Sequence, residues 1–235
     1  GMNETEMHAI LAEFELPAHF TEEVERDAEN IRGEITDSDI QARRDFRDIP
    51  TFTIDPADAR DFDDAISVKK LENGNWEVGV HIADVTHYVR PGTLTEEEAR
   101  QRATSVYLVD RVVPMLPERL SNHICSLNPS EDKLTYSAVF ELNEKAEIKD
   151  EWFGRTIINS DRRFSYREAQ MVIDTGEGDM KEQLLLLNNL AQQLRSKRFA
   201  LGAFSFERVE VQFELDKEGK PLGIKFRDMG TANQL

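Results

Sequence analysis

The sequence predicts an α+β fold in which a mixed, largely antiparallel sheet is flanked by helices. Three observations lead to this prediction: pairs of apolar runs at hairpin spacing, a few helical patterns with capping residues, and no regular alternation of strand and helix. The chain has 235 residues, of which 39% are hydrophobic, and it contains thirteen Phe. This content is enough for a sizeable core and excludes a wholly disordered chain.

The expected helices are marked by caps or by an apolar face. Thr21 is a suitable N-cap for the second helix, Thr95 opens the fourth with a capping box, and Ser165 opens the fifth with another. The last helix is the longest; it has a leucine-rich face and is followed by Gly202 as a C-cap. The expected ranges are 6–14, 21–31, 38–46, 95–105, 166–173 and 179–201.

The expected strands come as neighbouring pairs. Asn73-Gly74 between two apolar runs is a strong hairpin signal, and residues 143–147 separate the next pair. Residues 112–117 predict an extended loop, because two prolines exclude a helix there. The expected ranges are 51–54, 65–70, 76–83, 133–142, 148–160, 204–215 and 222–227.

Composition excludes several classes of protein. No stretch approaches the ~20 apolar residues that span a bilayer, and the first residues lack the features of a secretory signal, so no membrane partner is expected. Cys125, the single cysteine, has apolar neighbours, which predicts a buried structural thiol and a cytoplasmic location. The net charge of −17 argues against unassisted binding to a nucleic-acid backbone, and basic runs such as Arg162-Arg163 are interpreted as solvated helix faces or ends.

The strongest functional signal is a cluster of aspartates between two apolar runs. Asp55, Asp61, Asp63 and Asp64 lie within ten residues, and Asp58 adds a fifth acid. Crowded carboxylates raise each other's pKa unless a cation neutralises them, and Mg²⁺ or Mn²⁺ suits an all-oxygen ligand set. The alternative is a solvated acidic loop, but the β-branched, apolar flanks favour a metal site.

An EF-hand is excluded by the spacing of the same cluster. Counted from Asp55, the sixth residue of such a loop is Gly and the twelfth is Glu. Arg60 and Ile66 occupy those positions here.

The cluster and several later stretches resemble one family in order and spacing. The run Thr53-Ile54-Asp55 … Asp61-Phe62-Asp63-Asp64-Ala65 is similar to the signature of the ribonuclease II / ribonuclease R family of 3′→5′ exoribonucleases, whose catalytic domain is the RNB domain. The resemblance is closest to the bacterial ribonuclease R branch. The further matching stretches are 78–89, 103–108, 113–117, 120–122, 125–129, 204–207 and 232–235.

The resemblance implies hydrolysis of single-stranded RNA from its 3′ end to nucleoside 5′-monophosphates with the help of two metal ions. The protein is expected to be a monomer. Asp55 and Asp64 match carboxylates that hold Mg²⁺, with Mn²⁺ as a possible substitute. Asp63 matches the aspartate essential for activity, and Asp61 matches the fourth member of the set, so both are expected to be catalytic and to bind metal. These roles follow from the resemblance and not from spacing.

The resemblance also implies two RNA-binding aromatic residues. Tyr107 and Phe206 match a pair that clamps the last base by stacking, which tolerates any base sequence. From the residues alone, Tyr107 would be a core aromatic at a strand end and Phe206 an ordinary sheet residue. His81 is expected to be a hydrogen-bonded core residue, and Asp84 to position backbone or a water, so neither is assigned a catalytic role.

The chain also departs from the family pattern. We expect an acidic helical lead-in at 1–48 and the N-terminal portion of an RNB catalytic domain at 49–235, without the OB domains of the family enzymes. A later acidic residue and a later arginine of the family lie beyond the matched stretches, so this segment alone is expected to have little activity. The alternatives are a non-catalytic paralogue that binds RNA or protein, against which the intact aspartate set argues, and a metal-binding module unrelated to RNA.

Overall fold

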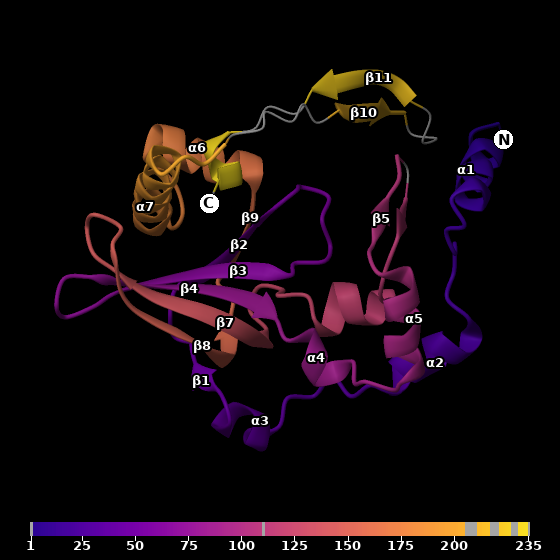
Figure 1. Cartoon of the computed structure of the whole chain (residues 1–235), viewed down its shortest axis with the longest axis horizontal. Helices are drawn as coiled ribbons and strands as arrows, with labels where there is room; N and C mark the ends of the chain where they lie inside the picture. Colours follow the sequence, from indigo (N-terminus) through magenta and orange to yellow (C-terminus); the bar gives the residue numbers. More distant parts are fainter. Residues whose placement is uncertain (1, 110, 205–210, 217–220, 227–229, 235) are drawn as a thin grey trace. The chain divides into compact units, whose positions relative to one another are not determined.

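The computed structural model describes residues 2–109, 111–204, 211–216, 221–226 and 230–234 (Figure 1). The chain forms two compact units. One consists of residues 1–32, 89–120 and 206–228, and the other of residues 33–88, 121–205 and 229–235. Each unit is therefore assembled from segments that are far apart in the sequence.

The second unit is built on a seven-stranded sheet in the order β1-β8-β7-β4-β3-β2-β9. The central pairs are antiparallel, whereas β1 with β8 and β2 with β9 pair in parallel at the two edges. This mixed, largely antiparallel sheet confirms the expected α+β fold. Its strands are β1 Arg44–Asp45, β2 Thr51–Asp55, β3 Asp64–Lys70, β4 Trp76–Ala83, β7 Asp132–Leu142, β8 Ile148–Asn159 and β9 Arg162–Ser165.

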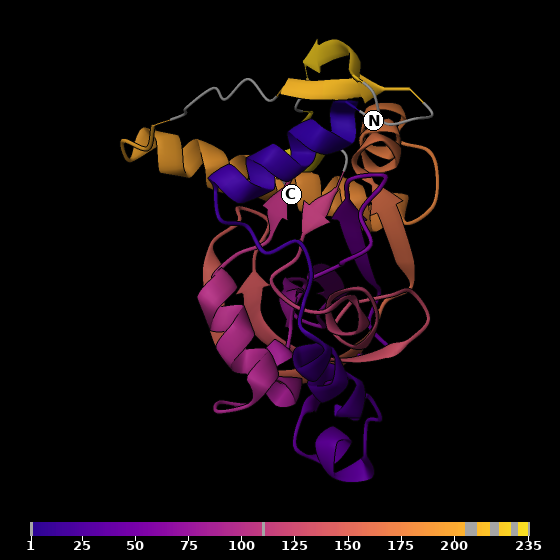
Figure 2. The same ribbon diagram turned by 90° about the vertical axis from the view of Figure 1, so that its right-hand side faces the viewer.

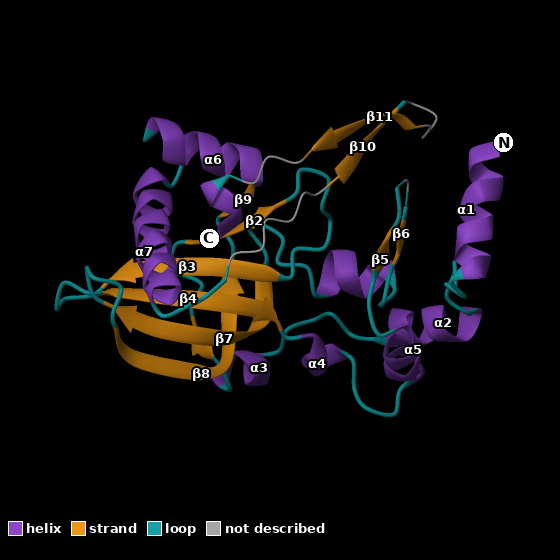
Figure 3. Cartoon of the chain, turned by 45° about the horizontal axis from the view of Figure 1, so that its top comes forward, coloured by secondary structure: helices purple, strands orange, loops and turns teal. Residues whose placement is uncertain are grey.

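Helices α6 (Tyr166–Thr175) and α7 (Lys181–Ala200) cover one face of this sheet (Figures 2 and 3). The expected capping box of α6 is present, and the leucine face of α7 packs on the strands. The core that they share includes Phe52, Val68, Val78, Leu142, Phe164, Leu184, Leu187 and Leu190. No helix in the part of the chain that the structure describes is long and apolar enough to cross a bilayer.

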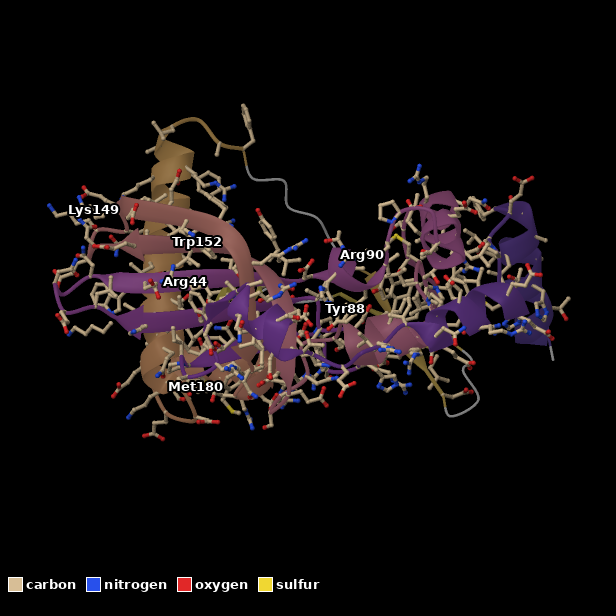
Figure 4. The ribbon with its side chains drawn as sticks, turned by 90° about the horizontal axis from the view of Figure 1, so that it is seen from below. Arg44, Tyr88, Arg90, Lys149, Trp152 and Met180 are labelled. Atoms are coloured by element: carbon tan, nitrogen blue, oxygen red, sulfur yellow. The ribbon has the colours of Figure 1, made fainter. Side chains whose placement is uncertain are left out.

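The expected helix over 38–46 is wrong beyond its first turns. Helix α3 covers only Asp37–Gln41, and β1 then pairs with β8. The Arg44 guanidinium lies over the ring of Phe46, 4.9 Å from the centroid. It also lies 5.3 Å from the ring centroid of Trp152, and Figure 4 shows these two side chains close together. These long-range contacts favour an extended backbone that local propensity does not indicate. The remaining short elements of this unit are α4 Val85–Tyr88 and the 3₁₀ turn η2 Thr231–Gln234.

The first unit contains the acidic helices expected near the N-terminus. Later parts of the chain add one helix and two short antiparallel strand pairs to it. Thr21 caps α2 as expected, but the cap of α5 is Thr93 and not Thr95. Thr95 is buried, and its amide and hydroxyl both donate to the Asp27 carboxylate, at 2.9 and 2.6 Å. The elements are α1 Met2–Glu13, α2 Glu22–Asn30, α5 Leu94–Arg102, β5 Val106–Tyr107, β6 Val112–Val113, β10 Val211–Leu215 and β11 Pro221–Phe226, while the π-helical segment η1 Arg119–Ile124 spans the boundary between the units.

Candidate active site

The aspartate cluster lies on the connection between two paired strands of the second unit. Asp55 is the last residue of β2, Asp64 is the first residue of β3, and these strands are antiparallel neighbours. We call residues 56–63 the aspartate loop. The loop begins with a turn in which the Ala59 amide donates to the Pro56 carbonyl at 3.1 Å. Strand pairing therefore holds the two ends of the cluster near each other.

Asp55 is a buried carboxylate, with only 6% of its surface exposed. The Thr53 hydroxyl donates to its Oδ2 at 2.5 Å. Burial raises the pKa of Asp55 to about 6; the Thr53 hydrogen bond and Arg163 oppose this shift, whereas the charges of Asp64 and Asp63 add to it. The protein therefore disfavours the ionised form of the Asp55 carboxyl group when no cation is bound.

Asp64 and Asp63 extend the acidic group to the surface. Both residues are exposed, and the Asp63 carbonyl accepts a hydrogen bond from the Ala83 amide at 2.9 Å. Partial loss of water raises the pKa of Asp64, and the charge of Asp63 and a hydrogen bond to its side chain raise it further. Asp55, Asp63 and Asp64 therefore form one electrostatically coupled group. Asp61 lies half-buried in the same loop, and its part in the site stays a prediction.

The far end of the aspartate loop is fixed by a segment that sequence reasoning did not single out for this role. The Phe62 amide donates to Ser126 Oγ at 3.0 Å, and the Phe62 carbonyl accepts from the Leu127 amide at 2.7 Å. Ser126 Oγ also lies 3.2 Å from the Arg60 carbonyl, to which it donates. Ser126 and Leu127 belong to the stretch 125–129 that carries the family resemblance. That resemblance was the only sign in the sequence that these residues could matter for the site.

The donor chemistry of this group fits a hard divalent cation. Carboxylate oxygens are the ligands that such ions prefer, and coupled carboxylates with raised pKa are stabilised when a cation neutralises them. Within the described residues, however, no three His, Cys, Asp or Glu side chains are grouped closely enough to hold a metal ion. The fit therefore rests on the kind and coupling of the ligands and not on a preformed cage.

The polar residues excluded from the catalytic set are structural. His81 is fully buried, with its ring nitrogens 2.6 Å from Ser137 Oγ and 2.8 Å from Ser67 Oγ, which confirms the expected hydrogen-bonded core residue. Burial would raise the pKa of Asp84, but its bonds to Arg43 at 2.7 Å and to Thr86 lower it overall. Cys125 is buried, and burial raises the pKa of its thiol to about 12, so it is inert as expected.

Of the two residues predicted to stack on RNA, the structure describes only Tyr107. Tyr107 lies on β5 of the first unit with 67% of its surface exposed, so the interpretation of Tyr107 as a core aromatic is wrong. Exposed aromatic rings of this kind are the ones on which bases stack in proteins that bind single-stranded nucleic acid. Phe206 lies outside the described residues.

Comparison with known proteins places the chain in a family. The family model of the RNB domain matches residues 43–235. The chain belongs to the RNB domain family. Ribonuclease R 2 of Lactococcus lactis is 39% identical over 239 residues, a match that covers 96% of this chain and 36% of that protein. The expected resemblance is therefore confirmed.

Solved structures share the RNB domain fold. RNase R of Mycoplasma genitalium, in complex with ribose methylated single-stranded RNA, matches with a TM-score of 0.90 at 27% identity, over 97% of this chain and 36% of that one. Yeast Ssd1, described as a pseudonuclease, matches with a TM-score of 0.64 at 25% identity, over 71% of this chain and 21% of its own. The chain thus spans about a third of the length of these two ribonuclease R relatives.

Proposed function

We propose that this chain provides the metal-binding part of a 3′→5′ exoribonuclease that hydrolyses single-stranded RNA to nucleoside 5′-monophosphates. The observation that carries the proposal is the coupled carboxylate group of Asp55, Asp63 and Asp64, where the aspartate loop joins two neighbouring strands. Membership of the RNB domain family and the likeness to ribonuclease R support the same reaction.

The position of each aspartate indicates its proposed role in metal binding. Asp55 and Asp64, at the ends of paired strands, would hold Mg²⁺ or Mn²⁺, and Asp63 and Asp61 would complete the ligand set from the loop between them. When bound, two such ions supply an activated water and stabilise the leaving 3′ oxygen. Because Asp55 is buried, its carboxylate is oriented before the substrate arrives.

The substrate would be gripped by aromatic stacking as well as by the metals. We assign Tyr107 and Phe206 to the clamp on the last base, since stacking accepts every base. The exposed ring of Tyr107 supports this role. We further propose that the protein works in the cytoplasm as a monomer.

The first test is Mn²⁺ binding by the purified chain, followed by the EPR signal of the free ion. The wild-type chain should bind Mn²⁺, and Asp63→Asn and Asp64→Asn should bind it much more weakly. Asp58→Asn is the matched control, because Asp58 is an exposed acid of the same loop outside the ligand set. Equal Mn²⁺ binding by all four proteins would contradict the proposal.

The second test measures hydrolysis. Residues 43–235 replace the matching region of the Lactococcus relative, and the shortening of 5′-labelled RNA and the release of monophosphates are followed with Mg²⁺. Asp63→Asn should lower the rate at least ~100-fold, as expected for the loss of a group that stabilises charge in the transition state. The proposal fails if Asp63→Asn is as active as Asp58→Asn.

A second candidate is a non-catalytic member of the family that binds RNA. The likeness to a pseudonuclease favours it. It predicts RNA binding by this chain that neither Mn²⁺ nor Asp63→Asn changes, whereas the exoribonuclease proposal predicts metal-dependent binding of the RNA 3′ end.

A further inference from the structure

Arg163 on β9 contacts both ends of the aspartate loop. Its Nη2 donates to the Pro56 carbonyl at 2.5 Å and to the Ala57 carbonyl at 3.0 Å, directly after Asp55. Its guanidinium also lies over the ring of Phe62, 5.3 Å from the centroid. A single side chain therefore joins the first turn of the loop to the residue that precedes Asp63.

Strand pairing explains why Arg163 reaches the loop. Strand β9 runs parallel to β2, with Arg163 beside Thr53 and Ser165 beside Asp55. The side chain leaves β9 next to the strand that ends in Asp55 and extends to the carbonyls that follow. A guanidinium suits this place because its fixed N–H groups can hold carbonyls while its flat face packs on a ring.

We propose that Arg163 is a positioning residue, which fixes the aspartate loop in the conformation that metal binding requires. The proposal rests on the function proposed above, since it deepens the role of the same site. Arg163 Nε is buried without a hydrogen-bond partner among the described residues, so the hydrogen bonds that its guanidinium makes to them are those of Nη2 with the loop. The loop is then fixed at its start by Arg163 and at its end by Ser126 and Leu127.

The sign of one effect separates positioning from simple electrostatics. A positive charge near a cation site repels the cation, so removal of the charge alone would tighten metal binding. Removal of a residue that orients the ligands instead weakens it, by about 10–100-fold for partners of metal ligands. Arg163→Met tests the two roles directly, because it removes the charge and the hydrogen bonds but keeps much of the apolar length.

The experiment compares Mn²⁺ affinity by EPR in the wild-type chain, Arg163→Met, Arg163→Lys and Arg162→Met. Arg162 is the matched control, since it lies on the same strand but pairs with Glu168 at 3.4 Å and not with the loop. We expect about 10–100-fold weaker binding for Arg163→Met, partial recovery for Arg163→Lys, and wild-type affinity for Arg162→Met. Equal or tighter binding by a folded Arg163→Met, with its fold checked by circular dichroism, would overturn the assignment.

A second measurement separates this inference from the proposed function. Hydrogen exchange of the Ala59 amide reports the loop turn without any metal. Faster exchange in Arg163→Met than in Arg162→Met supports the positioning role, and equal exchange overturns it. A wild-type chain that binds no Mn²⁺ would overturn the proposed function alone, because the exchange result would still decide whether Arg163 fixes the loop.

Discussion

His81 with its hydrogen-bonded neighbours Ser67 and Ser137 (the His81 cluster) and the coupled group of Asp55, Asp63 and Asp64 belong to one sheet, yet their buried polar side chains are in opposite situations. His81 is neutral and satisfied, because Ser67 and Ser137 face its two ring nitrogens and Ser137 continues to Thr156. Asp55 has one hydroxyl partner, and its charged neighbours Asp63 and Asp64 have the same sign as its own. Partnered polar groups stabilise the fold, whereas like charges held together cost stability and mark a site for a cation.

The largest expected effect is the removal of His81 from its cluster. His81→Ala would leave a cavity and two buried hydroxyls without their partner, so the free energy of unfolding should fall by about 3–5 kcal/mol. Urea unfolding measures this loss. A fall of less than about 1 kcal/mol would contradict the view that the cluster is structural.

The next effect is pH dependence from the same residue. Burial lowers the pKa of His81 from 6.5 to about 4, so below pH 6.5 the unfolded chain binds a proton that the folded chain does not. Stability should therefore be lost as pH falls from 6.5 towards 4, by up to about 3 kcal/mol. The difference in unfolding free energy between wild type and His81→Gln should change over this window, and a constant difference would refute the prediction.

A smaller effect is expected at Gly79, which leaves room for the cluster. A Cβ at this position would lie 2.6 Å from both His81 Nε2 and Ser67 Oγ. Gly79→Ala should therefore cost about 1–3 kcal/mol, because a buried, hydrogen-bonded pair must move. Gly74→Ala does not serve as a control, since Gly74 has a φ of 88°; the comparison is with Gly79→Ala in a His81→Ala background, where the penalty should shrink.

The smallest effect has the opposite sign. The pKa of Asp55 is raised from 3.8 to about 6, so the stability linked to its protonated form is present below pH 3.8 and is lost as pH rises through 6. Asp55→Asn should thus stabilise the chain at pH 7.5 in EDTA by about 1–2 kcal/mol. Thermal unfolding measures it, with Asp58→Asn as control.

Mn²⁺ should reverse the order of stability of the wild type and Asp55→Asn. Mn²⁺ should raise the melting temperature of the wild type, because an ion that binds only the folded chain stabilises it, and it should have little effect on Asp55→Asn. An Asp55→Asn chain less stable than wild type in EDTA would show that the ionised Asp55 carboxylate does not destabilise the metal-free protein.

Local signals in the sequence were sufficient for much of the fold. Asn73-Gly74 correctly predicted the hairpin of β3 and β4, and Ser165 with Glu168 correctly predicted the start of α6. These features depend on residues within four positions of one another, so they can be read without the rest of the chain. Thr95 shows the limit: a plausible cap by local spacing, it bonds instead to Asp27, 68 residues away.

The sequence by itself was sufficient for three conclusions about this protein: the set of aspartates, the family resemblance, and the expectation that His81 is a hydrogen-bonded core residue. Only the tertiary structure decided which groups meet. The parallel pairing of β9 with β2 brings Arg163 to the loop after Asp55, so one member of a basic pair interpreted as a solvated helix face or end lies on a strand and donates to the loop carbonyls. The physical reason is that parallel pairing of distant strands depends on the whole packed sheet, whereas hairpins and caps depend on a few neighbouring residues.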